Sequence, residues 1–165
     1  IIHAHQIGKS IHFDIRHKVN DHLQGFTVFT TGDYPNFKNL KGEVKHFRGA
    51  VKEPQPTEWL RFEGVTEPGK IGALRSKQFG GVFTIISKGE YEVLEVDDHK
   101  IHIKYYPESG KINKKPIEEA KERNWPVWNP GENLINFNKT ISYHIAHIGD
   151  KHIMLIDELK NVKSK

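Results

Sequence analysis

The chain of 165 residues contains no cysteine, and this absence removes a whole class of sites. Without thiols it forms no disulfide and no thiolate metal ligand, so a metal could be held only by His, Asp, Glu or backbone oxygen. The lack of cysteine is consistent with an intracellular, cytoplasmic protein. No apolar run approaches the roughly 20 residues of a membrane-spanning helix, and no signal peptide is visible. We therefore expect no membrane partner.

Several familiar catalytic signatures are also missing. The sequence has no phosphate-binding P-loop, no Gly-x-Ser-x-Gly and no His-Glu-x-x-His. Its composition, 36% hydrophobic and 28% charged, is that of a globular protein, and its length predicts one domain over residues 1–165. A net charge of +4 favours polyanions such as nucleic acid, although many unrelated proteins share it. The start at Ile1, without methionine, is compatible with a domain cut from a longer protein.

Residues 11–17, Ile-His-Phe-Asp-Ile-Arg-His, are the most informative stretch. Apolar and polar residues alternate strictly, which predicts a half-buried β-strand whose same-face side chains are roughly 6.6–6.8 Å apart. The apolar face suits a core. The other face carries His12, Asp14 and Arg16 in a row. A histidine and an aspartate can bind one divalent metal, and a neighbouring arginine can hold a phosphate oxygen.

Two interpretations of this polar face remain open from the residues alone. It is either a solvated face or structural His–Asp pair, or a metal or phosphate site. The chain has eleven histidines, so one near an aspartate is no surprise. Just upstream are His3 and His5, followed by a short flexible polar segment, residues 8–10, that could fold a further ligand back.

The alternation of apolar and polar residues, with turn signals every 8–12 residues, predicts about eight short strands. One helix is predicted over 114–124, with Pro116 in its first turn and a stop at residues 124–126. Together they predict a mostly β protein, a closed antiparallel β-barrel with one short flanking helix. The strands are expected at 11–17, 23–30, 45–48, 82–87, 90–96, 101–106, 140–148 and 152–156.

Residues 5–16, His-Gln-Ile-Gly-Lys-Ser-Ile-His-Phe-Asp-Ile-Arg, resemble the opening motif of the 3′-phosphoesterase domain of bacterial and archaeal DNA ligase D. Residues 20–27 resemble the turn and second strand of that family. Phe-Glu-Gly-Val at 62–65, Pro-Gly at 68–69 and Gly-Ala at 72–73 match a second family block in order and approximate spacing. The resemblance covers about residues 5–105, as in a divergent member.

The resemblance implies a β-barrel and a metal-dependent phosphoesterase that processes 3′ ends of DNA, or of RNA-tipped DNA, in DNA repair. His12 and Asp14 would bind the metal with His5 as third ligand, Mn²⁺ being expected and Zn²⁺ or another ion being the alternative. The family has one residue fewer between its first two histidines, so an ungapped match would place Gln6 there. His3 is a second substitute.

Other residues are expected to handle the substrate. The resemblance implies a DNA ligase or polymerase as a fused or associated partner, in a prokaryotic or viral context. His102 is expected either in the site, if the strands close into a barrel, or as a solvated side chain. The expected catalytic residues are Arg16, Arg48 and Gln55, and the expected substrate-binding residues are Lys9, Trp59 and His102.

Two positions depart from the family pattern. Gln55 and Trp59 stand where the family places a phosphate-contacting histidine and a tyrosine. A glutamine can hydrogen-bond a phosphate but cannot carry charge, and a tryptophan can stack but has no phenol. The alternative function is therefore a non-catalytic nucleic-acid end-binding module that keeps the same barrel and pocket.

Glu63 lies in an apolar stretch close to several glycines. We interpret it mainly as architectural, a carboxylate that caps loop amides. A metal or substrate contact is the alternative.

Overall fold

The computed structural model describes residues 1–29, 46–128, 137, 139–148 and 151–156, and of 46–48, 147–148 and 151–156 it describes the backbone alone. The described chain is mostly β, with one α-helix and one short 3-10 helix. The elements are β1 (Ile2–Ile7), β2 (Ser10–Val19), β3 (His22–Phe29), β4 (His46–Val51), η1 (Thr57–Leu60), β5 (Gly64–Val65), β6 (Gly81–Ser87), β7 (Gly89–Val96), β8 (Lys100–Pro107), α1 (Lys115–Glu122), β9 (Ile141–Ile148) and β10 (Lys151–Ile156).

The strands form one antiparallel sheet in the order β5-β6-β1-β2-β3-β4-β10-β9-β8-β7. The prediction of a closed barrel is wrong, because β5 and β7 are the two ends and no ladder among the described strands joins them. The count of about eight strands is also wrong, since the described part of the chain contains ten. Alternation along a sequence identifies strands, but whether the ends of a sheet meet depends on bending that the alternation does not encode.

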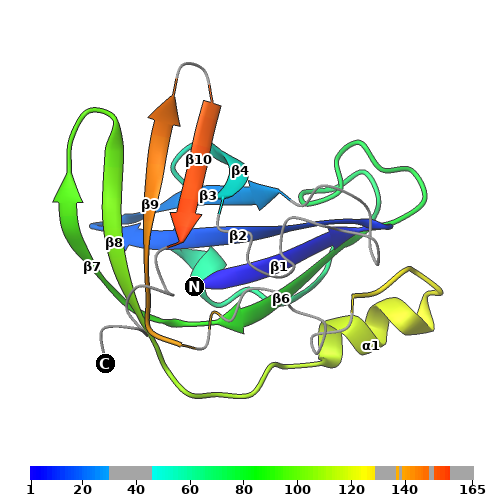
Figure 1. Ribbon diagram of the computed structural model, residues 1–165. Helices are drawn as coiled ribbons and strands as arrows, with labels where there is room; N and C mark the ends of the chain where they lie inside the picture. The colour runs from blue at the N-terminus through cyan, green and yellow to red at the C-terminus, as the bar shows by residue number, and fades with distance from the viewer. Residues whose placement is uncertain (30–45, 129–136, 138, 149–150, 157–165) are drawn as a thin grey trace.

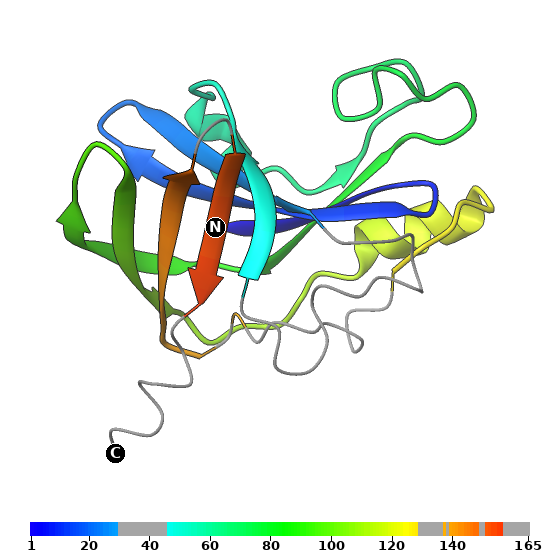
Figure 2. The same ribbon diagram turned by 45° about the horizontal axis from the view of Figure 1, so that its top comes forward.

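The sheet bends so that two groups of strands cross. In Figure 1, β6, β1, β2 and β3 run across the view, while β7, β8, β9 and β10 run from top to bottom, and Figure 2 shows the same crossing from above. The apolar core contains side chains from both groups, among them Phe13 and Ile15 of β2 and Ile103 and Tyr143 of β8 and β9. Each buried side chain of this size contributes about 1.5–3 kcal/mol.

The sequence analysis missed β1 and β5. Strand β1, Ile-His-Ala-His-Gln-Ile, alternates only from Ile2 to His5, and Gln6 and Ile7 break the pattern. Buried polar residues look like a solvated segment in a sequence, so the pattern gave no sign that β1 would be a strand paired on both sides, with β2 and β6. Strand β5 has only two residues, too few for any pattern.

The helix and two turns follow local chemistry. Helix α1 lies within the predicted range and has Pro116 in its first turn. Asn124 ends it with a φ of +58°, and Asn20 turns β2 into β3 with a φ of +56°. Asparagine tolerates this left-handed conformation better than most residues. In the described part of the chain, no helix is both long and apolar enough to cross a membrane.

Strand β2 is buried on both faces, not on one as predicted. Its apolar residues face the core, and on the opposite face Asp14 is 0% exposed and Arg16 is 2% exposed. Trp59 of η1 lies against Arg16 on this second face. The interpretation of a solvated polar face is therefore wrong. The sheet has a hydrophobic interior on one side of β2 and a buried polar layer on the other.

His17, near the end of β2, is buried against the far group of strands. Its imidazole shares a hydrogen bond with the hydroxyl of Tyr143 and packs against the ring of Tyr91 at 4.8 Å between centroids. Burial first, and the nearby amino terminus second, lower the pKa of His17 to about 3. Between about pH 6.5 and pH 3 the folded state therefore holds His17 neutral, whereas the unfolded chain protonates it.

The free energy of unfolding should fall as the pH drops from about 6.5 towards 3, because only the unfolded state binds a proton at residue 17 in that window. His17 contributes a slope of up to about 1.4 kcal/mol per pH unit. We expect His17→Gln to remove this slope, measured by urea unfolding between pH 7 and pH 4.5. The exposed His22→Gln is the control, and an unchanged slope in His17→Gln would contradict the assignment.

Candidate metal centre

The pairing of β1 with β2 places four polar side chains on one face. In the register of this ladder His5 is opposite His12, and His3 is opposite Asp14. Cross-strand partners point to the same side of a sheet, and residues two apart on one strand do so as well. Strand β1, which was not predicted from the sequence, therefore adds a second row of polar side chains to the face that alternation predicted on β2.

Three of these side chains, His5, His12 and Asp14, bring ligand atoms within 4.8 Å of one another. His5 Nδ1 is 3.0 Å from His12 Nε2, and the Asp14 carboxylate oxygens are 3.7 Å from His5 Nδ1 and 3.4 Å from His12 Nε2. Two ligands bound at about 2.1 Å to one ion are separated by roughly 3.0–3.4 Å at angles of about 90–110°. Two of the three separations lie in this range and the third, 3.7 Å, is slightly longer, so the three groups, which we call the metal triad, could hold one divalent ion after a small adjustment.

The tautomer of His5 suits this role. Its Nε2–H donates to the carbonyl oxygen of Gly72 at 2.7 Å, so Nδ1 is left unprotonated and faces His12 and Asp14. Burial, the largest cause, lowers the pKa of His5 and favours the neutral form. A carbonyl that holds the outer nitrogen of a ligating histidine is the usual support of a metal site. Gly72 lies in the loop of residues 66–79, which we call the Gly72 loop.

Glycine is required at position 72 by two separate constraints. Its φ is +88°, and an added Cβ would be 2.5 Å from Cε1 of Phe83. Phe83 in turn stacks on the imidazole of His5, with 4.1 Å between centroids. The ring and the carbonyl together fix the orientation of His5.

Asp14 is ionised despite its burial. Burial alone would raise its pKa, but His12, His5 and the ammonium of Lys52 outweigh burial and hold the pKa well below its usual value. Thr27 donates a hydrogen bond to Oδ1 at 2.7 Å, and Lys52 Nζ is 3.6 Å from the same oxygen. The carboxylate is thus a buried anion available as a ligand.

The alternative ligands, His3 and Gln6, do not belong to the group of ligand atoms within 4.8 Å of one another. His3 Nε2–H donates to the carbonyl of Phe62 at 2.7 Å, and burial lowers its pKa to about 4. Gln6 donates to the carbonyl of Gly8 and accepts from the amide of Trp128. His5, which needs a one-residue insertion relative to the family spacing, is the residue that joins the group.

Arg16 extends the polar layer beyond the metal triad. Its Nη1 is 3.5 Å from Asp14 Oδ2, and its guanidinium lies over the ring of Trp59 at 4.8 Å. Within the described part of the chain, the buried Nε and Nη1 have no hydrogen-bond acceptor, and neither Asp14 Oδ2 nor His3 Nδ1 has a hydrogen-bond partner. Each such buried polar atom costs about 1–3 kcal/mol. Several such atoms close together are typical of a polar binding site.

Gln55 lies close to Arg16 because residue 25 has no side chain. Gly25 is opposite Arg16 in the β2–β3 ladder, and a Cβ there would be 3.1 Å from Gln55 Oε1 and 3.2 Å from Lys52 Cδ. Backbone hydrogen bonds between Leu23 and Gln55 hold the segment in place. The sequence-predicted Gln55 therefore lies next to the site, and Trp59 packs on Arg16 as part of it.

Three other predicted residues stand apart from this group or cannot be placed. Lys9 is exposed at the β1–β2 turn, beyond the pairs that hold the triad. His102 lies on β8, stacked on His144 at 3.8 Å between centroids. Arg48 belongs to β4, but its side chain lies outside the described residues.

The sequence analysis missed three groups of the site: the Lys52 ammonium, the Thr27 hydroxyl and the Gly72 carbonyl. Thr27 follows from the register, since it is opposite Asp14 in the β2–β3 ladder, and a correct hairpin register would have found it. Lys52 and Gly72 come from segments distant in sequence, and no local pattern signals either contact.

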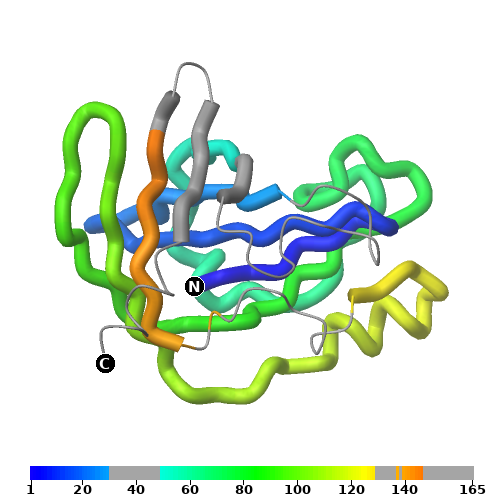
Figure 3. Tube along the Cα trace, viewed as in Figure 1, coloured from blue at the N-terminus to red at the C-terminus, as the bar shows by residue number. Residues whose placement is uncertain are grey.

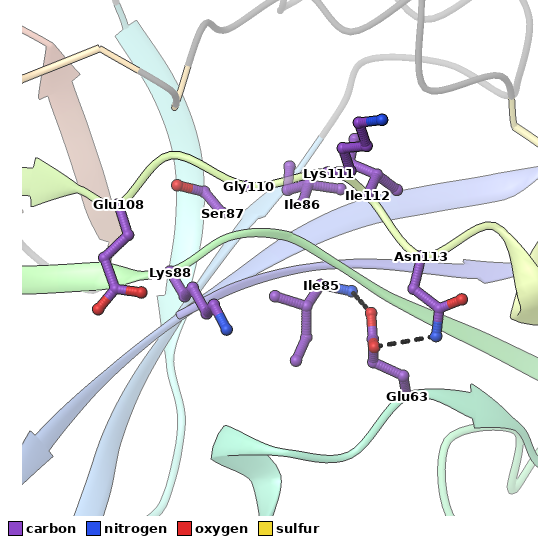
Figure 4. A pocket seen from close by; sticks show the side chains of 10 residues that line it. All are labelled: Glu63, Ile85, Ile86, Ser87, Lys88, Glu108, Gly110, Lys111, Ile112 and Asn113. Atoms are coloured by element: carbon purple, nitrogen blue, oxygen red, sulfur yellow. Dashed lines mark hydrogen bonds between the residues drawn. The ribbon is translucent and has the colours of Figure 1, made fainter.

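A surface pocket occurs elsewhere, between β6 and the segment of residues 108–113. In Figure 4, Glu63 is in its lower part, where its carboxylate accepts from the amide of Ile85 at 3.0 Å and from the side-chain amide of Asn113 at 3.2 Å. Glu63 therefore caps loop and strand amides, as the architectural interpretation predicts. None of the metal triad lines this pocket.

Replacing His12 by alanine should lower Mn²⁺ affinity by about 100-fold or more, because the change removes a ligand and loss of outer contacts alone costs 10–100-fold. Isothermal titration calorimetry with Mn²⁺ and with Zn²⁺ measures this. The exposed His22→Ala should bind both ions like the wild type. Unchanged affinity in His12→Ala, with a normal melting temperature, would show that the triad is not the metal centre.

Gly72→Ala tests the support of His5. The clash with Phe83 should displace the Gly72 carbonyl and lower metal affinity by about 10-fold or more. Gly69→Ala is a matched control, since Gly69 has a φ of +79° with nothing within 4 Å of an added Cβ. Both variants should lose stability through backbone strain, but only Gly72→Ala should lose metal affinity in the calorimeter. Equal affinities would refute the role of this carbonyl.

In comparisons with known proteins, no family model matches the chain and no curated protein matches it significantly. The resemblance to the ligase D phosphoesterase domain therefore stays a prediction. The donor set, its distances and its burial are what support a function.

Proposed function

We propose that the protein is a metal-dependent phosphoesterase that acts on 3′-phosphate or 3′-ribonucleotide ends of DNA. The observation that carries this proposal is the buried Arg16. Its Nε and Nη1 donors have no acceptor in the described part of the chain, and its Nη1 is 3.5 Å from the carboxylate of Asp14, a member of the metal triad. A guanidinium offers two parallel N–H donors that match two oxygens of a phosphate. A phosphate held there would lie against the triad.

The charges favour an anionic ligand. The buried carboxylate of Asp14 faces the cations of Arg16 and Lys52, so these three groups carry one net positive charge before any ion binds. A phosphate monoester carries a charge near −2 at neutral pH. In a partly buried site such attraction is screened less than at a surface.

The residues of the site would have separate roles in binding the metal and the phosphate. His5, His12 and Asp14 would hold the divalent ion, with Mn²⁺ or Zn²⁺ compatible with two imidazoles and one carboxylate. When bound, such an ion supplies Lewis-acid polarisation of a phosphate oxygen. Arg16 and Lys52 would orient the phosphate, and Gln55 would donate its side-chain amide. Hydrolysis of a 3′-phosphate end consumes one water, breaks the bond between phosphorus and the 3′ oxygen, and yields a 3′-hydroxyl and inorganic phosphate.

A second candidate is a module that binds the same ends without turnover. One observation supports this candidate. The segment after β4 places Gln55 and Trp59 next to Arg16, and neither side chain can transfer a proton at neutral pH. The metal and phosphate contacts would be the same in both candidates, so activity distinguishes them.

The proposal is tested by incubating the protein with a primer–template duplex that carries a 3′-phosphate, with and without Mn²⁺, and measuring conversion of the 3′ end. We expect conversion to a 3′-hydroxyl that requires the metal and is abolished in Asp14→Ala. Arg16→Lys should lower kcat/KM by about 100-fold, because the bidentate donor is lost. Arg61→Lys, at an exposed position in the same part of the chain, is the matched control.

Each outcome has a defined meaning. Binding of the 3′-phosphate end without conversion would reject the enzyme and favour the end-binding module. Conversion that survives in Asp14→Ala would reject the site. Neither binding nor conversion would reject both candidates.

A further inference from the structure

The Gly72 loop exposes two large apolar side chains next to the metal centre. Ile71 is 66% exposed and Leu74 is 71% exposed, and they flank the residue whose carbonyl holds His5. Single exposed apolar residues are ordinary, so these two gain meaning only from the charged groups around them.

The loop is held in one shape. The amide of Gly69 donates to the carbonyl of Ala73 at 2.9 Å, the amide of Ala73 to the carbonyl of Lys70 at 2.8 Å, and the amide of Phe79 to Ser76 Oγ at 3.1 Å. Ala73 is buried between the two exposed residues. Ile71 and Leu74 are thus presented on a fixed backbone.

The loop is also cationic. Lys70, Arg75 and Lys77 are all exposed. The acid of the loop, Glu67, is paired with Arg123 at 2.6 Å. Two apolar side chains are therefore surrounded by three cations, a composition complementary to bases and phosphates.

The loop projects beyond the β1–β2 hairpin that carries the metal triad. Figures 2 and 3 show it, in green, beside the tip of that blue hairpin. Gly8 at the tip is close to the loop, since an added Cβ would be 2.8 Å from Phe79. The exposed Lys9 follows in the same turn, so the cationic surface continues onto the hairpin.

We propose that the Gly72 loop binds the single-stranded nucleic acid that leads into the metal centre. This inference rests on the proposed function and specifies its substrate as a strand rather than an isolated phosphate ester. Ile71 and Leu74 pack against the faces of unstacked bases, as apolar side chains do in proteins that separate base steps. Lys70, Arg75 and Lys77 contact phosphates on the 5′ side of the end.

The position of the loop favours nucleic acid over other partners. The same backbone that carries the apolar side chains fixes His5 through the Gly72 carbonyl, so its occupant extends directly from the metal centre. That centre contains the cations Arg16 and Lys52, and the loop that holds His5 adds three exposed cations, Lys70, Arg75 and Lys77. A nucleic-acid backbone, which carries one negative charge per nucleotide, can contact several of these cations at once.

The test is fluorescence anisotropy of the full chain with a 3′-phosphorylated single-stranded oligonucleotide, in EDTA so that no turnover occurs. We expect Ile71→Ser/Leu74→Ser to weaken binding by about 10-fold or more, since base stacking contributes about 1–3 kcal/mol per base. Lys70→Ala/Arg75→Ala/Lys77→Ala should also lower the salt dependence, by a slope of about 2. Val93→Ser/Val96→Ser, which changes exposed apolar residues on β7, is the matched control.

The inference is supported if the wild type binds the oligonucleotide, both loop variants weaken this binding and the β7 control leaves it unchanged. This holds even if the protein converts no 3′-phosphate, so the inference and the proposed activity can fail separately. Equal binding by wild type and loop variants overturns the inference even if conversion is robust. The inference is also overturned if the wild type does not bind the oligonucleotide. Loop-dependent binding to anionic lipid vesicles in that case would identify a lipid surface as the partner instead. Melting temperatures and Mn²⁺ affinities of the variants show that the fold persists.

Discussion

The carboxylate of Asp14 is the group on which the polar layer of this protein depends. It is fully buried, and a buried charge is tolerated only when other charges and hydrogen bonds compensate its loss of hydration. His12, His5 and Lys52 supply that compensation, together with the hydrogen bond from Thr27 and the guanidinium of Arg16. Removing the carboxylate would leave Arg16 and Lys52 without the anion that both of them contact. A layer of this kind is weak evidence for stability and better evidence for a site that binds something.

The bent sheet provides the rigidity that such a site needs. The ladder of β1 with β2 fixes the spacing of His5, His12 and Asp14 by backbone hydrogen bonds, and β6 supports the outer side of β1. A metal centre on paired strands keeps its geometry better than one on loops. The covering segments then contribute single atoms, the carbonyls of Gly72 and Phe62, that set the tautomers of two histidines. The sheet holds the ligands, and the loops orient them.

The two departures from the ligase D pattern acquire a physical meaning in this arrangement. Trp59 covers the guanidinium of Arg16 and packs against Phe62 and Phe83, so it shields the cation from water. Gln55 lies above Gly25 with its oxygen close to the same layer. Both residues can shape and desolvate a phosphate pocket. Proton transfer, if the protein catalyses hydrolysis, has to come from water or from groups outside this pair.

The sequence by itself determined the local structure and part of the site. Alternation identified β2 and its row of His12, Asp14 and Arg16, and turn and helix chemistry at Asn20, Pro116 and Asn124 placed a hairpin and α1. These features depend on neighbours along the chain, which a sequence records.

Only the tertiary structure decided that the polar face of β2 is buried, that the sheet stays open, and that Lys52 and the Gly72 carbonyl reach the site while His102 packs on His144. Each of these depends on which strands pair and which loops fold over them. Pairing and covering are contacts between residues far apart in sequence, and local patterns of polarity carry no record of them.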